Sequence, residues 1–134
     1  MNIFIFGNGN LRFTDYLKLY VEPIRKIGFG ADIHFTVCDF RGVDALTMEF
    51  LKCETANVSV FHIGEMPRYL PDKFKTKVGE WKLVGGFESD KARDFAAIEN
   101  CTHFLAFDFN SDEKRKSGTL KNIEKCLNLE KIRL

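Results

Sequence analysis

The segment from His103 to Asn122 reads HFLAFDFNSDEKRKSGTLKN, and its pattern predicts a strand, a polar loop and a helix in that order. Its first residues form a short apolar and aromatic run, the composition of a buried strand. Its last residues open an amphipathic helix at Ser117, after a polar loop with both signs of charge. Free backbone N–H groups at such a helix start, together with the helix dipole, favour a phosphate or carboxylate. Asp108 ends the strand and is expected to face the same space. The plainer alternative is an ordinary N-cap at Ser117.

The composition is that of one domain spanning residues 1–134, with enough apolar residues to form a core. Hydrophobic residues make up 45% of the 134, and 14 of them are Phe. Lys plus Arg number 20 and Asp plus Glu 19, a balance that argues against a general nucleic-acid or membrane surface. No apolar run approaches the roughly 18 residues that span a bilayer. The first residues lack the basic flank of a signal peptide, so a cytoplasmic location is expected.

The cysteine spacing predicts free thiols rather than a metal site. Cys38, Cys53, Cys101 and Cys126 are widely separated and include no C-x-x-C pair. This pattern argues against structural zinc and fits a reducing compartment, so neither a metal nor a cofactor is predicted. Each cysteine is expected to be a small core residue rather than a nucleophile.

Hydrophobic periodicity predicts strands and helices in alternation along the chain. The predicted strands are Asn2–Phe6, Ile33–Val37, Val58–Ile63 and His103–Phe107, and Lys131–Leu134 is a last short strand or a tail. The predicted helices run from an N-cap at Thr14 to Gly28 and Gly30 with a break at Pro23, over Ala45–Leu51, from an N-cap at Ser89 to Asn100, and over Ser117–Leu129. In the third helix, the expected core positions are Ala92, Phe95, Ala96 and Ile98.

The segment from Gly64 to Gly86 has no clear period. It is expected to be a long loop that covers a site, or to hide a short strand at Trp81–Val84. The order of elements favours an α/β fold, with a mainly parallel sheet of about five strands and helices on both faces.

In a parallel sheet, the loops that follow the strands gather at one edge, where ligands bind near a switch in strand order. Glycines there admit close backbone approach, arginines offer forked donors to phosphate, and aspartates accept from ribose hydroxyls or base edges. The predicted ligand-binding residues are Gly7, Asn8, Gly9, Arg12, Asp39, Arg41, Gly42, Asp44, Arg93, Asp108, Ser117, Gly118 and Thr119. The alternatives are surface ion pairs for Arg12 and Arg93, a solvated Arg41, and an Asp44 favoured only by the helix dipole.

Four short motifs together resemble the SLOG superfamily, and the likeness is strongest to its YpsA-like branch. They are Gly7-Asn8-Gly9 with Arg12, then Asp39-Phe40-Arg41-Gly42-Val43-Asp44-Ala45-Leu46, then Lys91-Ala92-Arg93-Asp94, and last Asp108 with Lys116-Ser117-Gly118-Thr119. This superfamily includes the DNA-processing protein Smf/DprA and the LOG cytokinin-activating enzymes. The resemblance covers essentially the whole chain. It implies a single Rossmann-like three-layer domain that binds a nucleotide or a nucleotide-derived ligand.

Two departures from the family pattern bear on the predicted activity. The compact Gly-Ser-Arg turn of the family is stretched here, which puts the role of Arg12 in doubt. The LOG enzymes carry an acid where this chain has Asn122, and an amide cannot act as a general base. Glu124 lies about 200° further around the helix and is expected to face away from the site.

The leading hypothesis is therefore a cytoplasmic sensor or accessory module that binds a nucleotide-like small molecule. The rival is an N-glycosidase or phosphoribohydrolase in which Asp44 or Asp108, the catalytic candidates, or Asp39 supplies the missing carboxylate. A nucleic-acid accessory protein is a third alternative, and the net charge of +1 argues against it. The many Phe residues leave room for self-association as a homo-oligomer.

Overall fold

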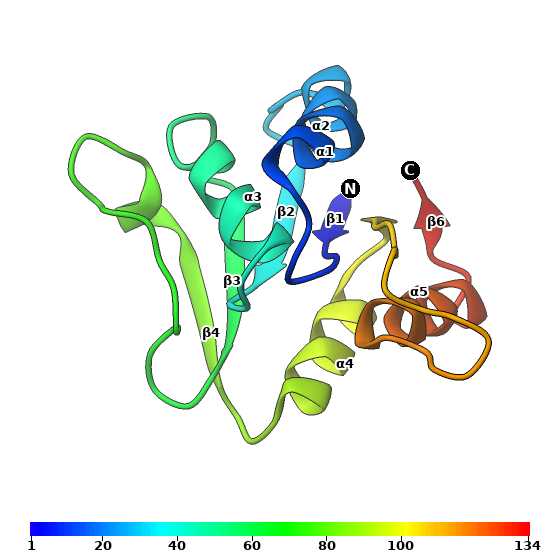
Figure 1. The fold of residues 1–134 in the computed structure, drawn as a ribbon. Coiled ribbons are helices and arrows are strands. Elements are labelled where there is room, and N and C mark those ends of the chain that lie inside the picture. The colour runs from blue at the N-terminus through cyan, green and yellow to red at the C-terminus, as the bar shows by residue number, and fades with distance from the viewer.

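The computed structural model describes residues 1–134, whose helices and strands alternate as predicted (Figure 1). The strands are β1 (Asn2–Ile5), β2 (His34–Cys38), β3 (Val58–Ile63), β4 (Lys82–Phe87), β5 (His103–Leu105) and β6 (Ile132–Arg133). The helical segments are α1 (Phe13–Tyr16), η1 (Leu17–Val21), α2 (Glu22–Ile27), α3 (Val43–Leu51), η2 (Val78–Glu80), α4 (Asp90–Asn100) and α5 (Gly118–Asn128).

All six strands run parallel in one sheet of order β4-β3-β2-β1-β5-β6. The chain builds outward from β1 through β2 and β3 to β4, and then returns to place β5 on the other side of β1. The strand order therefore switches between β1 and β5, where Phe4 pairs with Phe104. This is a Rossmann-like arrangement, and in sheets of this kind ligands bind in the crevice outside the carboxyl ends of the strands at the switch, here β1 and β5.

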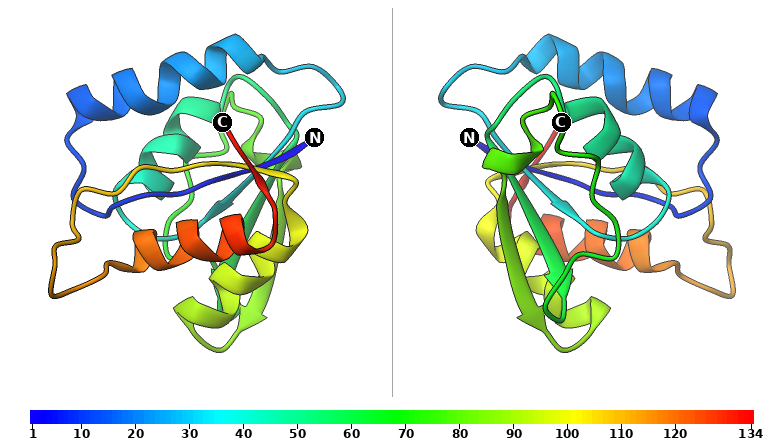
Figure 2. Two further views of the ribbon diagram at one scale, coloured as in Figure 1. Left: turned by 90° about the vertical axis from the view of Figure 1, so that its right-hand side faces the viewer. Right: turned by 90° about the vertical axis from the view of Figure 1, so that its left-hand side faces the viewer.

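Helices cover both faces of the sheet and form two hydrophobic cores (Figure 2). The continuous helical run α1–η1–α2 and helix α3 cover one face, where Ile3, Ile5, Phe35 and Val37 point. Helices α4 and α5 cover the opposite face, where the alternate residues of the same strands are buried, Phe4 and Phe104 among them. This alternation follows from the two-residue period of side chains along a strand.

The first helical run begins two residues earlier than predicted, because Thr14 is not its N-cap. Arg12 occupies the cap position with extended backbone, and it provides no side-chain cap. The predicted break at Pro23 is not a restart, because the helical backbone continues through it: Leu17, Val21 and Glu22 all have right-handed helical dihedrals. A π-helical turn, η1, ends at Val21 just before Pro23, which has no N–H to donate within the run. Gly28 ends the run with a φ of 84°, as the sequence indicated.

The segment Gly64–Gly86 contains the hidden strand, longer than predicted, rather than one structureless loop. Trp81 anchors the segment: its ring is buried, and its Nε1 donates to the Thr55 carbonyl at 2.9 Å. β4 then pairs with β3 along Ser59–Ile63. The sheet therefore has six strands instead of about five.

Helix α4 begins after Ser89, whose Oγ caps Ala92 N at 3.1 Å as predicted, but its buried face is different. Ile98 is buried as predicted, but Ala92 and Phe95 are exposed, and Arg93 and Ala97 are buried in their place. The helix is rotated relative to the prediction because the ion pairs of Arg93 lie on the inner side, where apolar side chains were expected.

Three of the four cysteines lie in the core. Cys38, Cys101 and Cys126 are buried core residues, but Cys53 is exposed, contrary to the prediction. None of the helices combines the length and apolarity needed to cross a bilayer.

Candidate functional site

A cavity of about 630 Å³ opens at the carboxyl edge of the sheet, beneath the switch in strand order. Its floor is formed by Phe4, Phe6 and Cys38, side chains on the α4–α5 face of the sheet. Its walls come from the β1–α1 loop, the β2–α3 loop, the first turns of α4, and the β5–α5 segment that enters α5. The cavity therefore brings together segments more than a hundred residues apart.

Asn8 joins the β1–α1 loop to the entrance of α5. Its side chain is buried, with Nδ2 donating to Asp108 Oδ1 at 2.9 Å and to Thr119 Oγ1 at 3.3 Å. Its Oδ1 accepts from Phe109 N at 2.8 Å, and its carbonyl accepts from Val43 N at 3.3 Å. The side chain and the backbone carbonyl of Asn8 thus fix the positions of the β1–α1, β2–α3 and β5–α5 loops relative to one another.

Two glycines are required for these loops to pack together. A Cβ on Gly7 would collide with the Tyr20 hydroxyl, which bridges Phe6 O and Phe107 N where β1 and β5 diverge. Gly42 has a φ of +76°, and a Cβ there would meet the backbone of Gly9. Both contacts exclude a side chain, so these glycines shape the rim of the cavity by close backbone approach.

Asp108 organises the loop before α5 instead of facing the cavity. Its Oδ1 accepts from the Ser117 hydroxyl at 2.6 Å, from Asn8 Nδ2 at 2.9 Å and from Asn110 N at 3.2 Å. Burial alone would raise the pKa of Asp108, but hydrogen bonds from Ser111, Ser117 and Asn8 outweigh it and lower the pKa to about 2. This carboxylate is therefore ionised, with three donors on its Oδ1.

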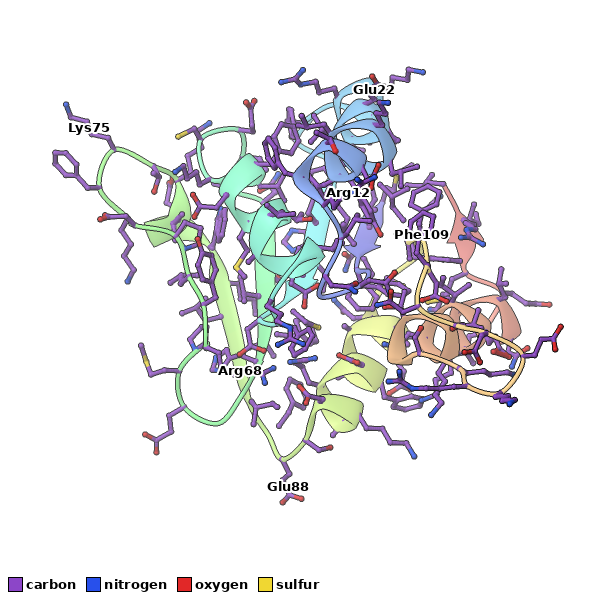
Figure 3. The ribbon with its side chains drawn as sticks, viewed as in Figure 1. Arg12, Glu22, Arg68, Lys75, Glu88 and Phe109 are labelled. Atoms are coloured by element: carbon purple, nitrogen blue, oxygen red, sulfur yellow. The ribbon has the colours of Figure 1, made fainter.

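Arg93 is buried and neutralised by three carboxylates, so it is not the surface ion pair considered as the alternative. Its Nη1 lies 2.8 Å from Asp39 Oδ1 and 2.9 Å from Asp90 Oδ1, and its Nη2 lies 2.8 Å from Asp94 Oδ1. Asp39 also receives the guanidinium and backbone N–H of Arg68, which reaches it from the long β3–β4 connection (Figure 3). Although burial raises the pKa of Asp39, its bonds to Arg68 lower it overall.

Asp44 also lines the cavity wall, but neither Arg68 nor Arg93 forms an ion pair with it. Its side chain is in the first turn of α3, its residue is 5% exposed, and its Oδ2 accepts from Phe40 N at 3.0 Å. No donor of the chain reaches its other oxygen. Burial raises the pKa of Asp44 to about 7, with further raising by Asp94 and Asp39 and partial lowering by Phe40 N–H and Arg93. A carboxyl group with this pKa exchanges a proton near neutral pH.

Asp94 and Asn122 form a pair across the cavity wall. Asp94 Oδ2 accepts from Asn122 Nδ2 at 2.9 Å, and Asp94 Oδ1 accepts from Arg93 Nε and Nη2 at 3.0 and 2.8 Å. Both residues line the cavity. The amide at position 122, which the sequence marked as unable to act as a base, thus orients a carboxylate carried by α4.

Free N–H donors for an anion lie at the start of α5, and two arginines without ion pairs line the same cavity. Ser117 caps Leu120 N at 3.0 Å, while the N–H groups of Gly118 and Thr119 have no acceptor in the chain. Arg41, stacked on the Phe40 ring at 5.3 Å, and Arg115 also line the cavity, and neither forms an ion pair within the chain. The free N–H groups and the two arginines suit a phosphate or carboxylate, and the carboxyl groups of Asp44 and Asp94 suit hydroxyl or protonated groups.

The structure brings nine of the thirteen predicted residues into the cavity wall: Gly7, Asn8, Gly9, Arg41, Asp44, Arg93, Ser117, Gly118 and Thr119. Asp39, Gly42 and Asp108 lie behind it and hold its frame. Arg12 points to solvent, with a side chain 81% exposed and paired with Asp15, so the stretched first loop carries it away (Figure 3). Glu124 does not line the cavity, in agreement with its predicted direction.

Sequence reasoning missed several wall residues, chiefly Asn10, Phe40, Asp90, Asp94, Asn110 and Arg115. Asp90 and Asp94 follow β4, so a definite strand at that position would have placed the start of α4 at the carboxyl edge. Arg115 lies in the polar loop between β5 and α5, whose mixed charges are visible in the sequence. No protein-family model, curated protein or solved structure matches this chain.

Proposed function

We propose that this protein binds a nucleotide or a nucleotide-derived small molecule at the carboxyl edge of its sheet, as a sensor or accessory module. The observation that carries the proposal is the cavity of about 630 Å³. Its wall holds the free N–H groups at the start of α5, the arginines Arg41 and Arg115 without ion pairs, and the Asp44 carboxyl group, which accepts one hydrogen bond. Its volume lies within the range of roughly 300–1,000 Å³ for small-molecule sites.

The three kinds of group in the wall match the three parts of a nucleotide. The Gly118 and Thr119 N–H groups, with Arg41 and Arg115, would receive the phosphate. Asp44 and Asp94 would accept hydrogen bonds from ribose hydroxyls. Phe40, a residue 37% exposed in the wall, would give the base an aromatic contact beside Arg41 and Arg68, which lie 5.3 and 5.6 Å from its ring centroid. The resemblance of the motifs to SLOG proteins leads to the same class of ligand.

A Gly118→Asp variant tests this proposal, with Gly79→Asp as its matched control. A Cβ at either glycine meets nothing within 4 Å, and neither residue has a positive φ, so both variants should fold. Calorimetry against nucleoside mono-, di- and triphosphates, nucleotide sugars and cyclic dinucleotides should show binding by the wild type and by Gly79→Asp. The new carboxylate at 118 should weaken binding by at least tenfold, because it repels the phosphate from the helix N-terminus. Binding by no member of the panel, or unchanged binding by Gly118→Asp, would contradict the proposal.

A second candidate function is that of an N-glycosidase or phosphoribohydrolase acting on a nucleoside or nucleotide. One observation favours it: Asp44 combines burial, an open oxygen and a pKa near 7 in the cavity wall, which are features of a general acid–base group. Of the two catalytic candidates, Asp108 is the weaker, because it lies outside the wall and its hydrogen bonds hold it ionised.

A further inference from the structure

We propose that Tyr20 sets the width of the ligand crevice, because its hydroxyl group is inserted between the ends of β1 and β5 and holds them apart. Tyr20 belongs to the hydrophobic core on the face of the sheet opposite the cavity floor, and it does not line the cavity. It is therefore a positioning residue for the site, and this role rests on the nucleotide-binding function proposed above.

The hydrogen-bond ladder between β1 and β5 stops one bond short of the loops that form the site. Ile5 is paired with Leu105, and Phe6 N donates to Leu105 O at 3.2 Å. In a regular parallel ladder the next bond would run from Phe107 N to Phe6 O. The Tyr20 hydroxyl takes the place of that bond, because it donates to Phe6 O at 2.8 Å and accepts from Phe107 N at 3.0 Å. A side chain from the first helical run thus replaces one backbone hydrogen bond of the sheet.

The inserted hydroxyl separates the two strands where the loops of the site begin. A direct N–H···O bond would hold Phe107 N and Phe6 O about 2.9 Å apart, and two bonds through one oxygen hold them farther apart. Gly7 follows Phe6 in the β1–α1 loop. Asp108 follows Phe107 in the segment that enters α5. The hydroxyl therefore limits how closely these two walls of the cavity approach each other.

Asn8 limits the same gap in the other direction. Its Nδ2 donates to Asp108 Oδ1 at 2.9 Å, and its Oδ1 accepts from Phe109 N at 2.8 Å. Tyr20 prevents the two walls from closing, and Asn8 prevents them from separating. A gap fixed in both directions keeps the free N–H groups at the start of α5 at a constant distance from the β1–α1 loop, as a ligand that bridges the cavity requires.

The surroundings of Tyr20 hold its ring in one position. The residue is fully buried, and its ring packs edge-on against Phe107 with centroids 5.4 Å apart and stacks on Tyr16 at 5.2 Å. A Cβ at position 7 would collide with the hydroxyl, so Gly7 is needed beside it. The helical run is π-helical over Leu17–Val21, which includes Tyr20, and π-helical turns are frequent at functional sites.

Removal of the hydroxyl predicts a specific rearrangement. In Tyr20→Phe the ring keeps its packing, but Phe6 O and Phe107 N lose their partner, which is costly for buried backbone groups. A direct bond between them satisfies both groups and extends the parallel ladder by drawing β5 toward β1. The segment that enters α5 then moves toward the β1–α1 loop, and the cavity narrows.

Calorimetry with the panel of nucleotides named above tests this role, with Tyr16→Phe as the matched control for Tyr20→Phe. Tyr16 is buried one helical turn earlier, and its hydroxyl donates to Thr47 in α3 at 2.9 Å, so the control loses a buried hydrogen bond that does not involve the strands. Tyr20→Phe should bind at least about tenfold more weakly, because the phosphate loses a hydrogen bond in the narrowed cavity, while Tyr16→Phe should stay within about twofold of the wild type. Incorporation of 4-aminophenylalanine at position 20 should restore binding, because its amino group occupies the same place and can donate to Phe6 O.

NMR tests the separation of the strands without any ligand. A coupling through the hydrogen bond between Phe107 ¹⁵N and the Phe6 carbonyl carbon should be absent in the wild type and present in Tyr20→Phe. A folded Tyr20→Phe that lacks this coupling or keeps the wild-type affinity would overturn the role of Tyr20, as would an equal loss of binding in Tyr16→Phe. If Tyr20→Phe does not fold, weak binding by the folded 4-aminophenylalanine protein would overturn it in the same way. If the wild type binds no nucleotide, the proposed function fails, and the coupling alone decides whether Tyr20 separates the strands.

Discussion

At the scale of single residues, two aspartates at the same edge of the sheet have opposite protonation behaviour. Asp108 receives several hydrogen bonds and ionises readily, whereas Asp44 receives one and does not. The sequence could predict that both would lie at this edge, because each follows a strand. It could not separate them, because the difference depends on the burial of Asp44 and on the hydrogen bond from Asn8 to Asp108, and both arise only in the folded protein.

The raised pKa of Asp44 predicts a specific dependence of stability on pH. Between its unfolded value of 3.8 and its folded value of about 7, the folded protein retains a proton that the unfolded chain has released. The contribution of Asp44 to stability therefore falls as pH rises through this window and is lowest above pH 7. Asp44→Asn should remove this loss and stabilise the protein at pH 8 by up to about 4 kcal/mol, with little change at pH 4. Urea denaturation at both pH values measures this. A variant that is less stable than the wild type at pH 8 would contradict the folded pKa.

At the scale of elements, the first turns of helices α4 and α5 line the cavity, and the serines that cap these helices form different numbers of hydrogen bonds. The predicted N-cap at Ser89 is confirmed, and the N-cap at Ser117, the plainer alternative to an anion site, is present as well, because a serine before an amphipathic run is a local signal. It did not predict β4 with confidence or the inward face of α4, because both depend on tertiary contacts. Trp81 reaches Thr55, and Arg93 reaches Asp39, and neither contact has a local signature.

The two caps can be compared directly by substitution with alanine. Ser89→Ala removes one cap bond, to Ala92 N, and should cost about 1 kcal/mol of folding free energy. Ser117→Ala removes the cap bond to Leu120 N and also the bond to the Asp108 carboxylate, so it should cost roughly 2–3 kcal/mol. It should also raise the pKa of Asp108, which NMR titration of the carboxyl carbon would follow. Equal costs for the two variants would show that the Ser117–Asp108 bond adds nothing to stability.

At the scale of the whole molecule, parallel strands gather the chemistry of distant segments at one edge. The sequence predicted this convergence from the alternation of strands and helices, and the sheet order confirms the switch between β1 and β5. It misplaced Arg12, because the length of the first loop decides on which side of α1 that arginine emerges. The start of the long loop at Gly64 is likewise outside the cavity, and only Arg68 of that segment reaches the ion cluster behind it.

The central claim is that these separate loops form one site for a single anionic ligand. Two-dimensional ¹H–¹⁵N NMR during a titration with adenosine 5′-monophosphate tests it most directly. We predict that the amides of Gly7, Gly9, Arg41, Gly118 and Thr119 shift together along one saturating curve, while Gly79 stays in place. Shifts confined to one of these loops, or an unchanged spectrum for this and every other nucleotide, would contradict the account.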